Sequence, residues 1–379
     1  MHPVLLSRPA GAPPGASVHL NFATDQGFQS GNGGGPVARF LTTSASSVRY
    51  GEWRSGLWQA FASNVPVITD KGLAVWMART NVALYCRDLT NAAWTKTNCT
   101  AALNQVGIDG AANSASSLTA TAGNATCLQA ITLASSARFQ SAFVRRLTGS
   151  GTVEMTMDNG STWTAITVTS SWTRVSIPTQ TLANPIVGFR IATSGDAIAV
   201  DFVQNENGTF ATSPILTTSG SAARAADVVT LRTALTFGLA YSIAATATPM
   251  AAVGFVTQQI ILSIHDGTTN NRAQIHRAAT TSLASVALVS AGATQYSVGG
   301  AVAGVGISYS GAMAALAGSH QAGLAGVVSA AIDRPMIVAP TIVSFGSVAN
   351  IFHWNGTIER ATFFPRRISA EELRRVTAP

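Results

Sequence analysis

Residues 153–168 alternate between apolar and polar side chains on both sides of a turn sequence, and this pattern constrains the fold more than any other. Residues 153–157 alternate, and residues 161–168 alternate again on the return. The intervening Asp158-Asn159-Gly160 favours a tight hairpin, because Asn-Gly accepts the positive φ angles that such a turn requires. The pattern predicts two antiparallel strands joined by a short turn, each with one face toward a core.

Further short strands are expected around this hairpin. Residues 171–177 read as a strand that Pro178 ends, and residues 186–191 are expected to pair with residues 197–203 across a short turn. Several short strands at this spacing, without a convincing helix, are typical of a sandwich or jelly roll. We therefore expect one β domain over residues 81–222.

A second β domain is expected over residues 223–379, after a small polar linker at 217–222. One short helix should end the chain, since Ser369 and Glu372 form a capping box and Leu373 supplies an apolar contact. The predicted fold class is mainly β: two tandem β-sandwiches after an extended N-terminal arm, with one short C-terminal helix. The strands expected in the second domain are residues 255–264, 272–275, 285–289, 295–298, 304–309, 336–338 and 356–364.

The first 80 residues divide into two stretches. Residues 1–40 are rich in Pro and Gly, cannot build a core alone, and predict an extended arm that becomes ordered against a partner. Residues 41–80 contain Trp53, Trp58 and Trp76 between short strand patterns. They predict a strand-rich connector whose tryptophans pack on the core of the next domain, with sugar stacking as the alternative.

The chain is poor in charge and rich in apolar residues. Only 10% of its residues are charged and 47% are hydrophobic, which excludes global disorder. So few charges favour a surface partly buried by other copies of the chain, for instance in a trimer; the alternative is a monomer with a neutral polar surface. A membrane-spanning helix is not expected, because polar residues interrupt the uncharged stretch 278–332.

The formal net charge is +7 and comes almost entirely from arginine. A basic balance suits nucleic acid or an acidic surface polysaccharide. The arginines are scattered, with small groups at 145–146, 366–367 and 374–375, and no basic helix is present. Nucleic-acid binding is therefore not expected.

Four sequences between residues 78 and 218 resemble, as a set, the carbohydrate-binding-like domain of bacteriophage head-spike and tail-fibre proteins. The resemblance implies a jelly-roll fold for this region, in agreement with the strand patterns. The matching sequences are Ala78 to Lys96, Gly110 to Ala120, Val200 to Gln204 and Phe210 to Ile215.

Residues from about 224 to the end resemble the concanavalin A-like (laminin G-like) module that often follows such a domain. The matching sequences are Leu262 to Arg272 and Gly356 to Arg367; the middle, residues 278–333, matches less well and is rich in Ala and Gly. Together the two resemblances imply a structural protein of a phage or gene-transfer particle, assembled in the bacterial cytoplasm and displayed on the particle surface. Its expected partners are copies of itself, host cell-surface polysaccharide, and a capsid, portal or tail protein bound through the arm.

Glycan binding needs polar side chains for hydroxyl groups and an exposed aromatic for a sugar face. The candidates are Asp266, Asn270, Asn271 and Arg272 in one loop, and the pair His353-Trp354. For both the alternative is structural, since Asp-Gly and Asn-Asn also form turns. Trp94, Trp163 and Trp172 are interpreted as packing residues.

No enzyme, metal site or cofactor is expected. Glycosidases need two carboxylates that flank the bond, and the acidic residues here are dispersed. Glu154, Asp196, Asp201 and Glu206 could approach one another on neighbouring strands, but they are interpreted as surface or turn residues. A polysaccharide depolymerase and a purely structural decoration or spike-base protein remain the alternatives.

Three cysteines, Cys86, Cys99 and Cys127, form neither a disulfide scaffold nor a zinc motif. They are interpreted as small apolar core residues of a protein made in a reducing cytosol.

Overall fold

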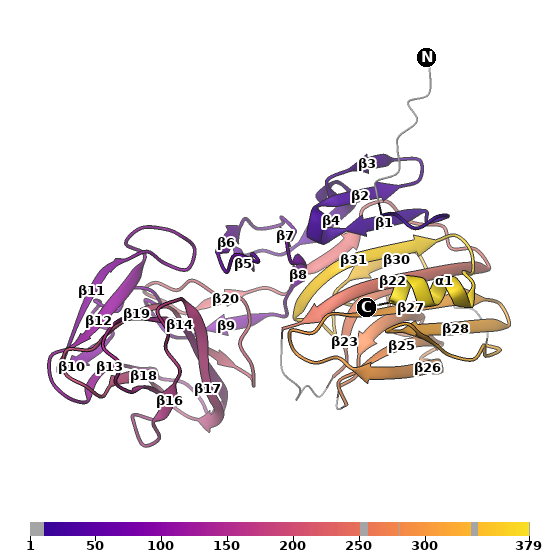
Figure 1. Ribbon diagram of the computed structural model, residues 1–379. Coiled ribbons are helices and arrows are strands. Elements are labelled where there is room, and N and C mark those ends of the chain that lie inside the picture. Colours follow the sequence, from indigo (N-terminus) through magenta and orange to yellow (C-terminus); the bar gives the residue numbers. More distant parts are fainter. Residues whose placement is uncertain (1–10, 251–256, 280, 335–339, 379) are drawn as a thin grey trace, which may run out of the picture. The chain divides into compact units, whose positions relative to one another are not determined.

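The chain folds as two β-sandwich units, and each unit is formed from segments that are separated in the sequence. The computed structural model describes residues 11–250, 257–279, 281–334 and 340–378. Unit 1 contains Met1–Ser46, Phe61–Met77 and Ala226–Pro379, and unit 2 contains Ser47–Ala60 and Ala78–Ala225. Both units are built of antiparallel strands, and the described chain has one α-helix, α1 (Ala370–Thr377) (Figure 1). The expected fold class of two β-sandwiches with a short C-terminal helix is confirmed.

Sheet A of unit 1 contains strands from both ends of the chain (Figure 1). Its strand β31 (Gly356–Phe364) pairs with β1 (Val18–Asn21) on one side and β22 (Ala240–Pro249) on the other. Beyond β1 lie β2 (Gln26–Gln29) and β3 (Gly33–Gly35); beyond β22 lie β27 (Tyr309–Leu316), β28 (Ser319–Leu324) and β29 (Val327–Val328). The hairpin of β7 (Val67–Thr69) and β8 (Gly72–Val75) joins the start of β31 through β8.

Sheet B packs against one face of sheet A to form the core of unit 1. Leu20 and Ile243 of sheet A and Leu262 and Ile275 of sheet B are fully buried in this core. The order of strands in sheet B is β26 (Ala293–Val302), β25 (Leu283–Ser290), β24 (Arg272–Arg277), β23 (Gln259–His265), β30 (Ile342–Phe345), β21 (Val228–Leu231) and β4 (Leu41–Ser44).

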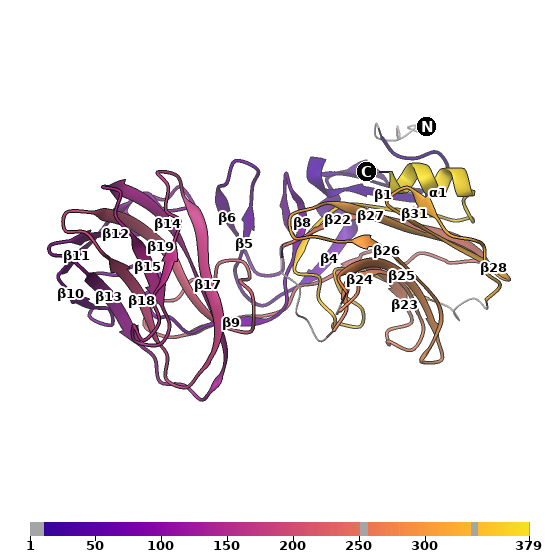
Figure 2. The ribbon, with the colours of Figure 1, turned by 60° about the horizontal axis from the view of Figure 1, so that its bottom comes forward.

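Helix α1 lies on the opposite face of sheet A from sheet B (Figure 2). The predicted capping box is present, with the Ser369 hydroxyl accepting from the Glu372 backbone and the Glu372 carboxylate accepting from the Ser369 backbone. Leu373 is fully buried in a small cluster with Ala244 and Ala314 of the sheet. Apolar packing thus fixes a helix that is too short to be stable alone.

Unit 2 also has two facing sheets, here named C and D. Sheet C has the order β10 (Thr95–Thr97), β13 (Ala125–Ala130), β18 (Ile186–Ile191), β15 (Val153–Thr156) and β16 (Thr164–Ile166). Sheet D has the order β11 (Cys99–Gln105), β12 (Ala115–Ala120), β19 (Ala197–Asn207), β14 (Ser136–Thr148) and β17 (Thr173–Leu182). Strand β9 (Arg79–Asn81) pairs with the end of β19 and with β20 (Ala222–Arg224), and β5 (Arg49–Glu52) and β6 (Trp58–Phe61) form a separate hairpin.

The strand order of unit 2 is that of a jelly roll. From β12 to β19 the chain crosses repeatedly between the sheets, so that β12-β19-β14-β17 faces β13-β18-β15-β16. Side chains of both sheets, including Leu118, Val200, Met155 and Phe189, share one buried core. Eight strands in two such sheets are the jelly-roll arrangement.

The Asp158-Asn159-Gly160 hairpin is confirmed. Strand β15 pairs with β16, and Asn159 and Gly160 have φ angles of 60° and 78°. The strand of residues 171–177, however, does not stop at Pro178, because β17 continues to Leu182. Since β17 lies at the edge of sheet D and pairs with β14 alone, proline removes no donor that a neighbouring strand needs.

The predicted pairing of residues 186–191 with 197–203 is wrong. Strand β18 pairs with β13 and β15 in sheet C, whereas β19 pairs with β12 and β14 in sheet D. Turn residues 193–196 therefore carry the chain from one sheet to the other. Val187 and Val200 are both fully buried, so each strand has an apolar face directed into the sandwich.

In unit 1 the predicted strand 356–364 coincides with β31. Strands β23 to β26 overlap the strands predicted over residues 255–264, 272–275, 285–289 and 295–298. The strand expected over residues 304–309 is wrong, because β27 begins only at Tyr309. A turn precedes it, in which Ile307 N donates to Gly304 O and Gly306 has a φ of 74°. The predicted strand 336–338 lies outside the described residues.

The extended arm predicted for residues 1–40 is wrong in its described part. Val18 and Leu20 are fully buried, and β1 lies inside sheet A between β2 and β31. The Pro- and Gly-rich stretch is ordered by β31, a strand of the same chain. Residues 1–10 lie outside the described part of the chain.

The connector predicted for residues 41–80 is divided between the units. Strand β4 and the β7–β8 hairpin belong to unit 1, and the β5–β6 hairpin begins in unit 2. Trp58 is 3% exposed and its ring contacts Phe143 edge-on, 5.7 Å between centroids. Trp76 is 2% exposed, in a cluster with Val67 and Ala74. Trp58 therefore packs on the next domain as predicted, whereas Trp76 packs within unit 1, so the prediction is wrong for Trp76.

No helix among the described residues is long and apolar enough to cross a membrane.

Cys86 and Cys127 are buried and Cys99 is half-buried, all as free thiols. Burial raises the pKa of Cys86 and Cys99 to about 11 and that of Cys127 to about 12, so these thiols remain protonated and unreactive at neutral pH.

Candidate functional site

The polar side chains of the loop that connects β23 to β24 form hydrogen bonds within the loop and with neighbouring residues. The Asp266 carboxylate accepts from Thr268 N at 2.9 Å and from Asn271 Nδ2 at 2.7 Å. Hydrogen bonds from Thr268 and Asn271 lower the pKa of Asp266, which therefore stays ionised. Asn271 Oδ1 accepts from Ala291 N at 2.9 Å, and Arg272 Nε donates to Gln274 Oε1 at 2.6 Å.

The backbone of Asn270 contributes to the same arrangement, since its carbonyl accepts from Gly292 N at 3.0 Å. Asn270 and Asn271 thus fasten the loop to the turn between β25 and β26. These hydrogen bonds support the alternative interpretation that the loop is a structural turn. A ligand would have to displace them.

Trp354 is a core residue, so its assignment as a sugar-stacking residue is wrong. Its side chain is fully buried, its Nε1 donates to Thr357 O at 3.1 Å, and its ring meets Tyr309 at 6.2 Å between centroids. His353 is half-buried, and burial lowers its pKa.

The structure also separates the two predicted clusters. Ile260 N donates to Phe352 O, which places His353 beside the start of β23. Asp266 follows the other end of the same strand. A single ligand site cannot be built from both clusters.

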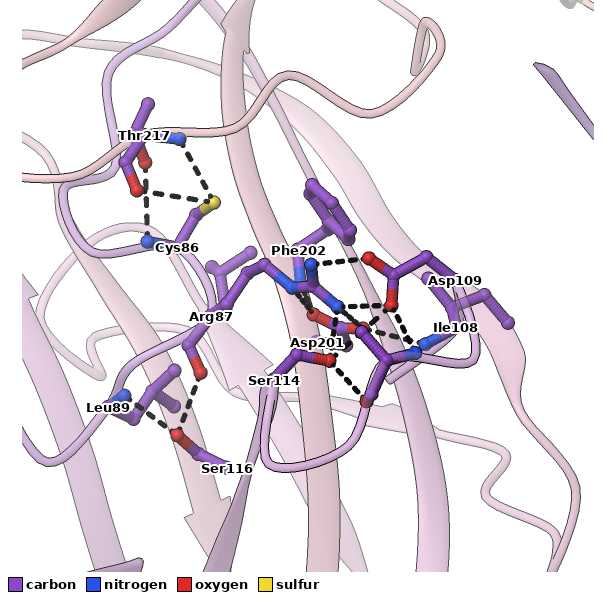
Figure 3. Close-up of polar contacts among 12 residues, drawn as sticks. Cys86, Arg87, Leu89, Ile108, Asp109, Ser114, Ser116, Asp201, Phe202 and Thr217 are labelled. Atoms are coloured by element: carbon purple, nitrogen blue, oxygen red, sulfur yellow. Dashed lines mark hydrogen bonds and ion pairs between the residues drawn. The ribbon is translucent and has the colours of Figure 1, made fainter. Parts of the chain in front are cut away.

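The Ala78 to Lys96 sequence holds a charged network instead of a ligand site (Figure 3). Arg87 Nε donates to Asp201 Oδ1 at 2.7 Å, and its Nη1 donates to Asp109 Oδ2 at 2.7 Å. The guanidinium also stacks on the Phe202 ring, 4.4 Å from the centroid. Because one arginine pairs with both carboxylates, this network ties Arg87, Asp109 and Asp201 together and stabilises the fold of unit 2.

The four acidic residues that could have formed a catalytic pair are occupied separately. Asp201 pairs with Arg87, Asp196 with Arg146 and Glu154 with Arg190, while Glu206 accepts hydrogen bonds from Thr212. Asp201 and Glu206 are fully buried, which corrects their interpretation as surface or turn residues. Within the described part of the chain, no group of three or more His, Cys, Asp or Glu side chains is placed to hold a metal ion.

A groove of about 300 Å³ lies on the face of sheet A that carries α1. Its floor includes Ala244 of β22, and Pro13 and Pro14 line it from the N-terminal segment. His19 of β1 and Thr362 of β31 are opposite each other in the sheet, with 2.8 Å between His19 Nδ1 and Thr362 Oγ1.

The charged groups of this groove are Arg360 on β31 and Arg375 in the last turn of α1. Both side chains are exposed, and neither forms an ion pair with another described residue. Arg360 Nε donates to Thr246 Oγ1 at 2.8 Å, which orients the guanidinium along the sheet. The groove therefore combines two cationic donors and two threonine hydroxyls with an apolar floor. Such a surface suits a ligand with several hydroxyl or anionic groups.

The sequence indicated these residues only weakly. The pair 374–375 appeared as a small basic group, but His19 and Thr362 lie 343 positions apart. Their side chains meet only because β1 pairs with β31. The prediction of an extended N-terminal arm did not include this pairing.

No family model and no curated protein matches this sequence. Parts of the chain are similar in structure to the CBM40 of the Ruminococcus gnavus IT-sialidase bound to α2,6-sialyllactose, at 18% identity over 37% of this chain and 83% of that chain, with a TM-score of 0.32. Domain 4 of AbnA, a GH43 extracellular arabinanase from Geobacillus stearothermophilus, in complex with arabinotriose, is 13% identical over 45% of this chain and 82% of that chain, with a TM-score of 0.33. The heptameric SAP-like pentraxin of Limulus polyphemus is 10% identical over 38% of this chain and 71% of that chain, with a TM-score of 0.29. At such values no family is assigned, and the ligand has to be inferred from the residues of this chain.

Proposed function

We propose that this protein binds glycans at the surface of a phage-like particle and that the groove of unit 1 holds part of the glycan. The observation that carries the glycan assignment is the convergence of Arg360, Arg375 and the Thr246 and Thr362 hydroxyls on an apolar floor. Sugars offer the complementary surface, because their hydroxyl groups surround a C–H face. No carboxylate is among the described residues that line the groove, and we infer binding without turnover.

The particle assignment rests on the sequences between residues 78 and 218 that resemble phage head-spike and tail-fibre domains. In this proposal the protein is a head-spike or tail-fibre subunit that recognises polysaccharide on the bacterial host. It is made in the bacterial cytoplasm and joins a capsid, portal or tail protein through its N-terminal residues. Self-association, for instance as a trimer, would cover part of its weakly charged surface.

The glycan assignment is tested with a glycan array and the full chain. The Arg360→Gln/Arg375→Gln double variant should bind the glycans recognised by the wild type at least about tenfold more weakly, since hydrogen bonds to a charged group contribute about 1.5–3 kcal/mol. Arg374→Gln is the matched control, because Arg374 lies beside Arg375 on α1 and is exposed but does not line the groove. Equal binding by the double variant and the control would reject the groove as the site.

The particle assignment needs a separate experiment. Electron micrographs of particles labelled with an antibody to this protein should show label on heads or on tails. Particles that lack the protein should adsorb poorly to their host. Normal adsorption by such particles, together with an empty glycan array, would instead support a purely structural decoration. Light scattering of the purified chain measures the proposed self-association, and a stable monomer at micromolar concentration would contradict it.

A further inference from the structure

Sheet D of unit 2 has two edges, and their residues differ. The end strands β11 and β17 each pair with one neighbouring strand (Figure 1). Strand β17 carries Arg174 and Pro178, and charged residues and prolines at an edge oppose pairing with a further strand. The seven residues of β11, Cys-Thr-Ala-Ala-Leu-Asn-Gln, include neither a charge nor a proline. One edge of the sheet is therefore protected against a further strand, and the other is not.

The end strands of the other described sheets are short or covered. Strand β26 has ten residues without a charge, but Arg334 Nε donates to Gln295 O of this strand at 2.6 Å and so covers part of its edge. Strands of four residues or fewer offer little backbone for pairing. This group contains β3, β4, β5, β6, β10, β16 and β29. Within the described chain, β11 is thus the long edge strand without a charge, a proline or a covering side chain.

The direction of the backbone groups of β11 follows from its neighbour β12. Ala120 of β12 lies opposite Cys99. Its N donates to Asp196 O at 3.0 Å and its O accepts from Gly195 N at 2.8 Å, so its backbone groups point away from β11. The pair of Cys99 and Ala120 is therefore of the type that exchanges no backbone hydrogen bonds, and such pairs alternate with bonded pairs along an antiparallel ladder.

Three residues of β11 consequently direct their N–H and C=O groups to the open side of the sheet: Cys99, Ala101 and Leu103. Thr100 and Ala102 lie between them and bond to β12. The strand is regular up to Leu103, after which a bulge shifts the register. Backbone donors and acceptors in such a row are a template for a further strand.

Apolar side chains accompany this edge. Leu103 is 39% exposed, and Val106, just beyond the strand, is 50% exposed. Cys99 and Ala101 are half-buried against the core of unit 2. A strand added at this edge would remove more of this apolar surface from water, which favours association.

We propose that two copies of this chain associate by pairing their β11 strands antiparallel about a two-fold axis at Ala101. In this register Ala101 lies opposite Ala101 of the partner subunit, and Cys99 lies opposite Leu103 of the partner subunit. The two residues of each such pair exchange two backbone hydrogen bonds. Sheet D of one copy then continues into sheet D of the other.

A second copy fits this edge because the segment is complementary to itself. The same surface serves both copies, as a two-fold interface requires. Apolar Cys99 meets apolar Leu103, and no charged side chain belongs to the paired segment. A register shifted by two residues leaves one outward residue without a partner, so the symmetric register forms the most hydrogen bonds.

The inference rests on the self-association in the proposed function and names its surface. A two-fold interface joins copies in pairs, so the expected assembly is a dimer. Sedimentation velocity of the full chain over the micromolar range should show wild-type protein as a monomer and dimer in equilibrium.

Ala101→Pro should weaken the association at least about tenfold, because proline removes a donor on the open side of the sheet and none that β12 needs. Pro178 of β17 shows that sheet D accepts a proline in an edge strand. Leu103→Lys places a charge on the edge and should weaken the association similarly. Leu216→Lys is the matched control, since Leu216 is 45% exposed in the same unit but lies outside β11.

A cysteine at the two-fold axis tests the register. Ala101→Cys should form a disulfide-linked dimer under mild oxidation, because the Cα atoms of a hydrogen-bonded pair lie about 5.5 Å apart, within reach of a disulfide. Ala102→Cys is the control, since the two copies of this residue lie diagonally, about 7–8 Å apart, which is too far. Mass spectrometry of the peptides separates the expected link from any link through Cys99.

The outcomes distinguish this inference from the proposed function. Circular dichroism and the unfolding midpoint establish which variants are folded. A monomeric wild type would overturn both the β11 pairing and the proposed self-association. Wild-type oligomers that persist in folded Ala101→Pro and Leu103→Lys would overturn the β11 pairing alone. The affinity for a single glycan, measured by titration, should be the same for Ala101→Pro and wild type, so the glycan assignment is read separately.

Discussion

Arg87 Nε donates to Asp201 Oδ1 at 2.7 Å, which joins two residues that are 114 positions apart in the sequence. The Asp201 carboxylate is fully buried and also accepts from the backbone N atoms of Ile108 and Phe202. Burial raises the pKa of Asp201, and the charge of Arg87 opposes that rise. One carboxylate thus fixes strand β19, the Arg87 segment and the loop at Ile108 relative to one another.

Asp201→Asn should destabilise unit 2 strongly. The substitution leaves Arg87 with Asp109 alone and replaces an acceptor oxygen by an amide donor, and breaking a buried pair costs about 3–5 kcal/mol. Urea unfolding followed by tryptophan fluorescence measures the change. Asp88→Asn in the same unit keeps the Oδ1 that accepts from Thr90 N and should have little effect. Similar unfolding midpoints for the two variants would show that the ion pair contributes little.

Buried histidine makes the stability of unit 1 depend on pH. His276 is 6% exposed, and burial together with the charge of Arg272 lowers its pKa to about 4. In the unfolded chain its pKa is about 6.5, so between pH 6.5 and 4 the unfolded state binds more protons than the folded state. Stability is therefore fully present above pH 6.5 and decreases as the pH falls toward 4.

The His276→Gln variant isolates this effect from that of other titrating groups. The stability difference between wild type and variant, measured by urea unfolding at pH values from 4 to 8, should be constant above pH 7. It should shift in favour of the variant by up to about 3 kcal/mol as the pH approaches 4. A difference independent of pH would mean that His276 is not held neutral in the folded protein.

Trp354→Phe should reduce stability without changing glycan affinity. The ring is fully buried and its Nε1 donates to Thr357 O, so the variant loses packing volume and leaves a buried carbonyl without its donor. We expect a loss of about 1–3 kcal/mol in thermal or urea unfolding. The binding of any array-positive glycan should stay within twofold at a temperature where the variant is folded. A selective loss of binding with unchanged stability would restore Trp354 as a sugar contact.

Features fixed by neighbouring residues were predictable from the sequence. The turn at Asn159-Gly160, strand β31 and the capping box of Ser369 and Glu372 each depend on a few adjacent side chains, and each appears as expected. The prediction that Pro178 ends its strand is wrong, because a proline is tolerated where β17 is an edge strand. Whether a strand lies at an edge is a property of the whole sheet and not of the local sequence.

The candidate sites were predictable only in part. Trp354 stands between His353 and Asn355, and these polar neighbours indicated an exposed position although the ring turns into the core. The groove depends on pairings between distant strands, such as that of His19 with Thr362. Local patterns cannot supply such pairings, because the register is set by the whole sheet.

The N-terminal residues differ clearly between prediction and structure, because they form strand β1 of sheet A instead of an extended arm. Leu20 on β1 is fully buried between the sheets of unit 1, whereas Leu239 is 75% exposed. Leu20→Ala should destabilise unit 1 by about 2–5 kcal/mol through lost burial and a residual cavity, while Leu239→Ala should change stability by less than about 0.5 kcal/mol. Urea unfolding of both variants measures this difference. If residues 11–40 formed a detached arm in solution, the two variants would unfold at the same urea concentration as the wild type.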